Sequence, residues 1–176
     1  MDILAHALWT TAAAVPIRKR LRHPFSLPWA AFWGVFPDLF SFAIPAIVRI
    51  WWYATGVTSS LRPDPKSGQH FQFVWQLYYC SHSLLVFAAV FGIVWALAGR
   101  PFLAMLGWLL HILIDISTHQ GIFALHFLWP LTPIAISGIR WETPRFLAVN
   151  YGMLLLVYSW MWINKRKVHG KQAAIQ

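Results

Sequence analysis

Charge, and negative charge above all, is scarce in this chain. Asp, Glu, Lys and Arg together make up 11% of the 176 residues, and only five residues are acidic. A soluble domain carries about 25% charged residues, so this chain lacks the charge that would cover a surface facing water. Cysteine is scarce as well. The chain has a single cysteine, Cys80, and this excludes a framework of disulfides. Apolar residues make up 59% of the chain, and this composition predicts an integral membrane protein.

Long runs with few charged residues predict where the chain crosses the membrane. A spanning helix needs about 20 mostly apolar residues. Several runs in this sequence approach that length, and residues 67–99 contain no Asp, Glu, Lys or Arg. We therefore predict an all-α fold, a polytopic membrane helical bundle with about four spanning helices. The predicted spans are residues 28–53, 79–98, 101–118 and 146–163.

Two further apolar segments do not fit a simple span. Residues 3–15 predict a helix too short to cross the membrane comfortably, so we expect it at the interface or inside the protein. Residues 122–139 contain two prolines and a glycine, which predicts a broken or re-entrant segment, or else a poor fifth span. We treat residues 1–163 as one membrane-embedded helical domain and residues 164–176 as a basic cytoplasmic tail.

The basic residues cluster beside the predicted spans. The net charge is +9, and eight of the 14 Lys and Arg residues lie in residues 18–22 and 165–171. Basic residues at span ends set the orientation and attract anionic headgroups, so we expect the lipid bilayer as the partner and no nucleic acid. Placing both clusters in the cytoplasm, together with Arg100, puts nine basic residues inside. The C-terminal tail is then cytoplasmic, and homo-oligomerisation stays open.

The segment WLLHILIDISTHQG, residues 108–121, combines an acid with histidines in an apolar stretch. On a helix His111, Asp115 and His119 follow each other at intervals of four residues and share one face. Imidazole nitrogen and carboxylate oxygen are ligands for zinc and similar divalent ions. A carboxylate buried in a bilayer needs a metal, a proton or a cationic partner. The alternative is that Asp115 is hydrogen-bonded by hydroxyl groups of its own helix or by a neighbouring helix.

Three other polar motifs interrupt apolar stretches. Asp38 follows Pro37 in GVFPDLF, where it could instead cap a helix that begins there. His82 stands between two serines at the start of a predicted span, where a lone histidine is commonly just a polar tip at the interface. Asp2 and His6 are four residues apart in the first helix, where an acid also stabilises the helix start. His6 lies on an otherwise apolar helix, which favours a ligand role.

One shared cation satisfies these groups more simply than a separate partner for each. The two catalytic candidates are Asp38 and Asp115. Enough ligands for one tetrahedral zinc, or for two metals that share a carboxylate, come from His6, Asp38, His82, His111 and Asp115. His119, at the end of its helix, is a weaker sixth ligand, and His126 is a further candidate for a ligand or a substrate contact. The predicted metal ligands are His6, Asp38, His82, His111, Asp115 and His119.

The order of these motifs resembles a known family, the bacterial integral-membrane metal-dependent hydrolases. The resemblance covers residues 1 to about 141 and is carried by MDILAHALW, FPDLF, CSHSLLV, HILIDISTH, FLWPL and GIRW. That family is distantly similar to zinc-dependent phospholipase C and to fungal zinc nucleases. The resemblance implies a protein of the bacterial inner membrane. It implies metal-binding roles for His6, Asp38, His82, His111 and Asp115.

The resemblance also implies an activity. A metal-activated water would hydrolyse a phosphodiester or a lipid-linked substrate, with zinc as the expected metal and manganese as the alternative. The general base would be Asp38 or a spare carboxylate. Two departures imply fewer metals or an inactive site. Phe40 stands where many relatives carry a second acid, and Leu77 and Tyr78 stand where many carry His-Arg.

Two other functions remain open at this stage. Intramembrane Asp and His residues also form proton relays and cation sites, so the chain could be a small transporter or an ion-conducting protein. It could also be a non-catalytic membrane interaction protein that keeps a metal only for folding.

Overall fold

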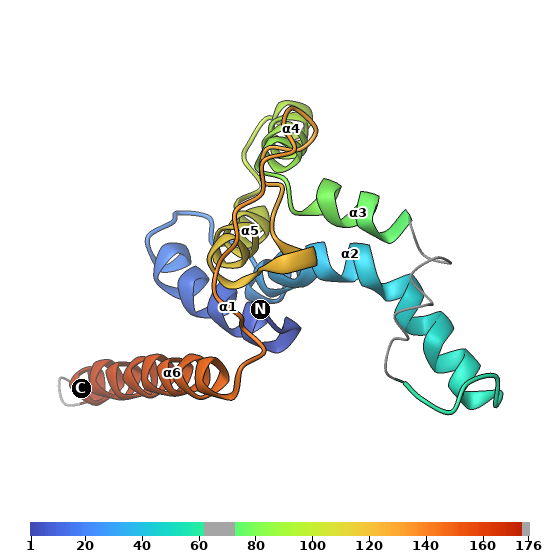
Figure 1. Ribbon diagram of the computed structural model, residues 1–176. Coiled ribbons are helices and arrows are strands. Elements are labelled where there is room, and N and C mark those ends of the chain that lie inside the picture. Colours follow the sequence, from blue (N-terminus) through green and yellow to red (C-terminus); the bar gives the residue numbers. More distant parts are fainter. Residues whose placement is uncertain (62–72, 174–176) are drawn as a thin grey trace.

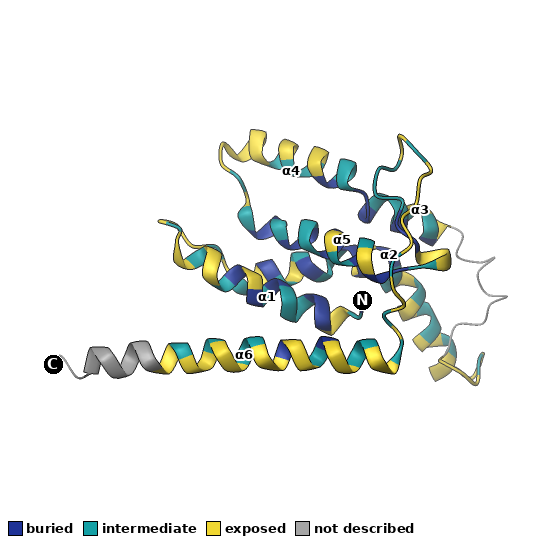
Figure 2. Ribbon diagram, turned by 60° about the vertical axis from the view of Figure 1, so that its left-hand side comes forward, coloured by how far each residue is buried: buried dark blue, intermediate teal, exposed yellow. Residues whose placement is uncertain are grey.

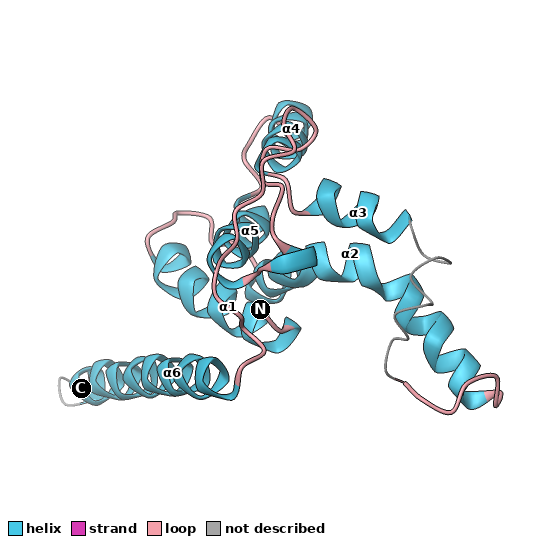
Figure 3. Cartoon of the chain, viewed as in Figure 1, coloured by secondary structure: helices cyan, strands magenta, loops and turns pink. Residues whose placement is uncertain are grey.

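The chain is all-helical, as the composition predicts. The computed structural model describes residues 1–61 and 73–173, with side chains described up to residue 166. Within these residues no strand forms, and a single isolated bridge joins Leu125 to Ile136. Figures 1 and 3 show the helices α1 (Ile3–Lys19), α2 (Leu27–Ala54), α3 (Phe73–Ser81), α4 (Leu84–Ala98), α5 (Leu106–Thr118) and α6 (Pro144–Ala173), with short 3-10 helices η2 (Leu103–Met105) and η3 (Gly121–Phe123).

Three helices pack together at the centre of the molecule. α2 contacts both α1 and α5, and the buried residues in Figure 2 concentrate where these three helices meet. α6 lies along α1, and α4 lies on the other side of α5 (Figure 2). Exposed apolar side chains cover much of α4 and α6, as expected of surfaces that face lipid.

Two to three helical segments are long and apolar enough to span a membrane. α2 meets the requirement, and so does the Pro144–Arg166 part of α6. α3 and α4 together make a third candidate, but they are bent by 65° at the break between them. The predicted uninterrupted helix over residues 79–98 is therefore wrong. The expected four spans are not confirmed among the described residues, because Leu103–Thr118 is a shorter apolar helix.

The break between α3 and α4 has a local cause. The Ser83 side chain accepts hydrogen bonds from the backbone amides of Leu85 and Val86, at 3.2 and 3.3 Å. A serine in this position starts a new helix, since it satisfies amides that have no partner inside the helix. α4 therefore begins at Leu84 in a new direction. His82 is left in the bend.

The structure differs in detail from the remaining predictions of helix bounds. The first helix does not end at residue 15 but continues through Pro16 to Lys19. Residues 122–139 are irregular beyond η3, which agrees with a broken segment and excludes a fifth helical span. Near its end this segment bonds to the end of α5, with the Gly138 amide 2.6 Å from the His119 carbonyl oxygen. The described part of the last helix continues past residue 163 to Ala173.

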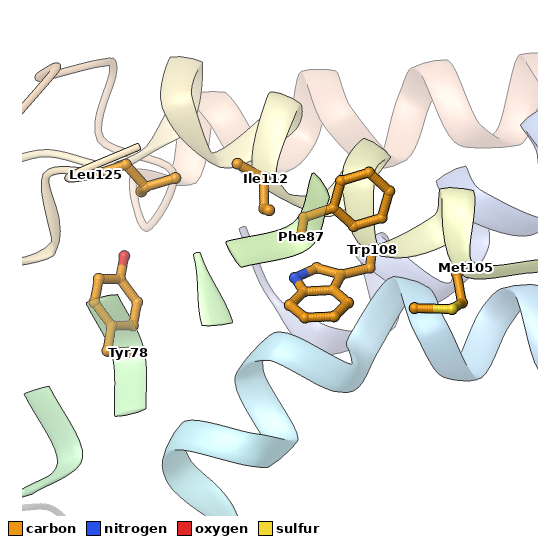
Figure 4. Packing of buried hydrophobic residues seen from close by; sticks show 6 residues of the cluster. All are labelled: Tyr78, Phe87, Met105, Trp108, Ile112 and Leu125. Atoms are coloured by element: carbon orange, nitrogen blue, oxygen red, sulfur yellow. The ribbon is translucent and has the colours of Figure 1, made fainter. Parts of the chain in front are cut away.

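A hydrophobic cluster holds the α3–α4 break against α5. Figure 4 shows its buried members, Tyr78, Phe87, Met105, Trp108, Ile112 and Leu125. Trp108 adds a directional contact, because its indole nitrogen donates to the Ser81 carbonyl oxygen at 2.6 Å. The cluster thus fixes the position of the bend relative to the helix that carries His111 and Asp115.

Glycines bring α2 and α5 into close contact. A Cβ atom at Gly107 of α5 would collide with the Ala30 carbonyl oxygen of α2, and one at Gly34 of α2 would collide with Thr10 of α1. Without these Cβ atoms the three helix backbones approach closely. The close approach brings the Gly34 carbonyl within reach of His111, one turn along α5 from Gly107.

Candidate metal centre

Four of the predicted ligands meet in one buried group. Asp38 comes from α2, His82 from the α3–α4 bend, and His111 and Asp115 from α5. Each offers one ligand atom, and these atoms all lie within 4.8 Å of one another. His111 and Asp115 are fully buried, and the exposed fractions of His82 and Asp38 are 1% and 8%. We call these four residues the metal group, because together they could bind a metal ion.

Asp115 lies at the centre of the contacts. Its Oδ2 is 3.1 Å from Nε2 of His111 and 3.7 Å from Nε2 of His82. Its Oδ1 is 3.0 Å from Nε2 of His6 and 3.1 Å from Nδ1 of His119. The Met1 amino nitrogen is 2.6 Å from the same Oδ1. All six predicted ligands are thus close to this centre, four in the metal group and two against Asp115.

Backbone carbonyls determine which nitrogens of His82 and His111 carry hydrogen. Nδ1 of His111 is 2.8 Å from the Gly34 carbonyl oxygen, and Nδ1 of His82 is 3.0 Å from the Tyr78 carbonyl oxygen. A carbonyl oxygen only accepts, so each Nδ1 donates and each neutral ring presents a bare Nε2. The two Nε2 atoms are 3.1 Å apart and face carboxylate oxygens. Such a set of acceptors needs a cation between them, either a metal ion or an added proton.

Buried polar atoms without a hydrogen-bond partner mark the same place. Several buried side-chain atoms of the described residues lack such a partner, and three of them lie here: Oδ2 of Asp115 and both ring nitrogens of His6. Nε2 of His6 is 3.0 Å from Oδ1 of Asp115, but the direction is wrong for a hydrogen bond. The His6 ring stacks on His111 with 3.8 Å between centroids. Because a buried polar atom without a partner is costly, a cation bound at this centre would compensate these atoms.

Asp38 is a candidate ligand and not a helix cap. α2 continues through Pro37 without a break, so the capping alternative is wrong. The Pro37 carbonyl accepts hydrogen bonds from the hydroxyls of Ser41 and Ser81, at 2.9 and 3.2 Å. Asp38 Oδ1 is 3.6 Å from Nε2 of His82 and 3.8 Å from Nε2 of His111. Its side chain is 12% exposed, the most open of the four.

His119 reaches Asp115 by a different route from the one predicted. The spacing predicts three residues on one helical face, but α5 ends at Thr118 and His119 adopts an extended conformation. Its amide still bonds to the Asp115 carbonyl at 3.0 Å, which turns the ring back towards Oδ1. His119 is therefore on the Oδ1 side of Asp115, away from the metal group.

Two residues support His82, and sequence reasoning anticipated the neighbouring serine but missed Tyr78. The Ser81 hydroxyl is 2.9 Å from Nδ1 of His82, and the Tyr78 ring lies 4.0 Å from the His82 ring between centroids. Tyr78 is buried and donates from its hydroxyl to the Phe123 carbonyl at 2.8 Å. Of the departures noted above, Tyr78 thus packs against His82, and Phe40 is 42% exposed. The sequence signal that could have identified Tyr78 was its spacing, since it precedes His82 by one helical turn.

The other candidate residues have different surroundings. Asp2 caps α1, with Oδ1 3.0 Å from the Ala5 amide and 2.8 Å from the Tyr151 hydroxyl, so the helix-start alternative is confirmed. The Glu142 carboxyl pairs with Arg140 at the surface, and a backbone hydrogen bond and Arg140 lower its pKa. His126 contacts Tyr79, at 4.5 Å between ring centroids, and is not in the metal group. Asp64 and His70 lie outside the described residues.

The centre therefore contains a metal-ligand set of mixed nitrogen and oxygen donors that comes from three separate parts of the chain. The ligand atoms are close together, buried and mostly acceptors. Comparison of the chain with known protein families, with curated proteins and with solved structures finds no match.

Proposed function

We propose that this chain is a membrane-embedded metal-dependent hydrolase that acts on a phosphodiester or a lipid-linked substrate. The observation that carries the proposal is the metal group, whose two bare imidazole nitrogens and two carboxylates converge in a buried space. The order of sequence motifs, which resembles membrane-embedded hydrolases, supports the same activity. A hydrolase needs both the cation and a path for water, and Asp38 lies on the more open side of the group.

The donor set favours zinc over manganese. Two imidazole nitrogens with the Asp115 carboxylate oxygen suit a tetrahedral zinc that keeps its fourth position for water, whereas manganese prefers more oxygen ligands. When bound, such an ion polarises a phosphoryl or carbonyl oxygen and lowers the pKa of a water molecule to about 7. Two metals sharing the Asp115 carboxylate would need further ligands, for which His6 and His119 are the nearest candidates.

Each residue then has a separate role. His82, His111 and Asp115 hold the cation, and the carbonyls of Tyr78 and Gly34 fix the two rings. Asp38 accepts a proton from water as the general base, because its carboxylate combines closeness to the group with partial exposure. Asp115 is both ligand and catalytic residue, since its charge balances the cation.

The proposal includes a membrane topology. We place the chain in a bacterial inner membrane as a bundle of about four spans, with Leu103–Thr118 as the shortest and the basic tail in the cytoplasm. The excess of Lys and Arg beside the ends of α1 and α6 supports this orientation. A substrate with its phosphodiester at headgroup level would suit a site inside such a bundle. Homo-oligomerisation is compatible with this arrangement.

The activity is tested with the purified full chain reloaded with zinc or manganese. Bis(p-nitrophenyl) phosphate and radiolabelled phospholipids are suitable phosphodiester probes. We expect metal-dependent hydrolysis by the wild type and none by the double variant His111→Ala/Asp115→Ala. The matched control, His23→Ala/Glu142→Ala, removes one histidine and one carboxylate at exposed positions and should keep the activity. Metal binding without hydrolysis of any phosphodiester would contradict the proposal.

One observation favours a second candidate function, a cation transporter or ion-conducting protein. The bend of 65° between α3 and α4 interrupts a candidate span at His82, inside the metal group. Transporters commonly place ion sites at such interrupted helices. Metal flux into liposomes that contain the purified chain, abolished by His82→Ala and without hydrolysis, would favour this function over the hydrolase.

A further inference from the structure

A large cavity lies far from the metal group. It has a volume of about 1080 Å³ and opens between the end of α1, the loop that leads to α2, and the later part of α6. Figure 2 shows α6 running beside α1 towards this end of the molecule. From His6 to Arg18 the helix rises by about 18 Å, at 1.5 Å for each of 12 residues, so the cavity is a separate site.

The lining is mainly apolar. The apolar side chains that line it come from all three segments, and they include Val15, Pro16, Leu21, Leu27, Val157 and Met161. A volume of this size is large enough for a drug-sized ligand, for which pockets are commonly about 300–1,000 Å³. An apolar cavity beside two membrane-like helices has an abundant apolar occupant, the acyl chain of a lipid.

The rim of the cavity is basic. Arg18, Lys19 and Lys165 line it, and no acidic residue does. The sequence also contains no acid between Asp2 and Asp38, and none after Glu142. Basic residues beside a membrane surface attract anionic headgroups. Arg18 and Lys19 therefore have no acidic residue in the neighbouring sequence, and a negatively charged group from outside the chain would complement them.

Tryptophans place the rim at the depth of the lipid headgroups. Trp160 and Trp162 also line the cavity, and the Arg166 guanidinium lies 3.7 Å from the centroid of the Trp162 ring. Tryptophan is enriched at the boundary between hydrocarbon and water, where its ring is apolar and its nitrogen is hydrated. The rim residues thus meet phosphates at the level where a bilayer carries them, while the apolar lining extends towards the acyl chains.

We propose that this cavity binds one anionic phospholipid of the bilayer. The acyl chain covers the lining formed by Val15, Val157 and Met161, and the phosphate pairs with Arg18, Lys19 and Lys165. Inorganic phosphate alone would leave the apolar lining uncovered, and a zwitterionic lipid would leave the positive rim without net compensation. The site does not depend on the proposed hydrolase, because none of its residues belongs to the metal group.

Lipid retention by the purified full chain tests the proposal. The chain is incubated in detergent with equal amounts of phosphatidylglycerol and phosphatidylcholine, and native mass spectrometry counts the lipids that stay bound. We expect one phosphatidylglycerol, retained at least tenfold over phosphatidylcholine. The variant Arg18→Gln/Lys19→Gln/Lys165→Gln should lose this preference. The control Arg20→Gln/Arg22→Gln/Arg100→Gln changes the net charge equally at positions outside the cavity and should keep it.

A second variant tests the apolar part of the site. Val15→Trp adds bulk to the apolar lining without changing the charge, and it should reduce phosphatidylglycerol retention at least tenfold even if the triple variant fails to fold. Equal retention of both lipids by the wild type would overturn the proposal, and so would an equal loss in the triple variant and its control. Displacement of the lipid by millimolar inorganic phosphate would also overturn it, because the phosphate would then bind without the acyl chain.

Discussion

At the scale of single residues, Asp115 is the point where the buried polar contacts converge. Its carboxylate is fully buried and meets His6, His82, His111 and His119 within 3.7 Å. A buried carboxylate is stable only when cations or hydrogen-bond donors compensate for its lost hydration. The Met1 amino group and the Thr118 hydroxyl donate to its Oδ1, but the neutral rings of His82 and His111 offer no donor towards its Oδ2, which has no hydrogen-bond partner. The metal group therefore calls for a cation on the Oδ2 side.

The substitution Asp115→Asn should remove the metal while the fold persists. The amide is nearly the same size, carries no charge, and offers a donor to the bare Nε2 of a neighbouring histidine. We expect metal content below a tenth of the wild-type value by elemental analysis, with the helical circular dichroism unchanged. The control is Asp2→Asn, because asparagine caps a helix as well as aspartate does. Full metal content in Asp115→Asn would contradict a ligand role for the carboxylate.

The substitution Ser81→Ala should weaken metal binding without abolishing it. The Ser81 hydroxyl is 2.9 Å from Nδ1 of His82 and helps to hold the ring. Loss of a group that orients a metal ligand commonly lowers affinity by about 10–100-fold. Competition with a metal-binding dye measures this change, and Ser59→Ala on an exposed loop is the matched control. An affinity equal in both variants would show that the hydroxyl does not support His82.

The candidate residues could be predicted from the sequence where helical spacing alone decides their position. His111 and Asp115 are one turn apart on α5, and the spacing predicts that they meet. The contact of Asp38 with His82 depends on how α2 packs against the α3–α4 bend, which spacing cannot give. The roles of Gly34 and Tyr78 were missed for a related reason, because they act through backbone carbonyls whose direction depends on the fold.

At the scale of elements, the centre depends on the close packing of α2 against α5. Gly107 and Gly34 leave out the Cβ atoms that would separate the helices, and His111 then reaches the Gly34 carbonyl at 2.8 Å. The bend between α3 and α4 brings His82 to the same place from the other side. A metal ligand set from three elements therefore requires both the close contact and the bend.

The substitution Gly107→Ala should separate α2 from α5. The added methyl group would collide with the Ala30 carbonyl, a backbone atom that cannot move aside easily. Overpacking of this kind costs about 1–3 kcal/mol, so we expect a lower free energy of unfolding and weaker metal binding. Gly92→Ala is the matched control, because a Cβ atom there meets nothing within 4 Å. Denaturant unfolding in detergent compares the two, and equal stability would contradict the close-contact account.

The positions of the helices were easier to predict than their breaks. Low charge predicts α2 to within a residue or so at each end, 28–53 against Leu27–Ala54. The uninterrupted 79–98 helix was wrong because uniform hydropathy does not register the capping by Ser83. The alternative that Asp38 caps a helix beginning there was wrong, because α2 continues through Pro37 although proline usually disturbs a helix.

At the scale of the whole molecule, the proposed topology puts the two ends of α6 on opposite sides of the membrane. Cys80 is the sole cysteine, so a Cys80→Ser background allows single-cysteine labelling. We expect a membrane-impermeant maleimide to label Glu142→Cys in intact cells and Lys171→Cys only after the membrane is opened. Labelling of both positions in intact cells, or of neither, would contradict a spanning α6 with a cytoplasmic tail.

The central claim is that the buried His and Asp residues hold a divalent metal. Elemental analysis of the detergent-purified chain, beside His111→Ala/Asp115→Ala and the control His23→Ala/Glu142→Ala, tests it most directly. The account predicts close to one zinc per chain in the wild type and the control, and less than a tenth of that in the double variant. No metal in the wild type, even after zinc is added back and the excess is removed, would contradict it, and an added proton would then be the cation between the two histidines.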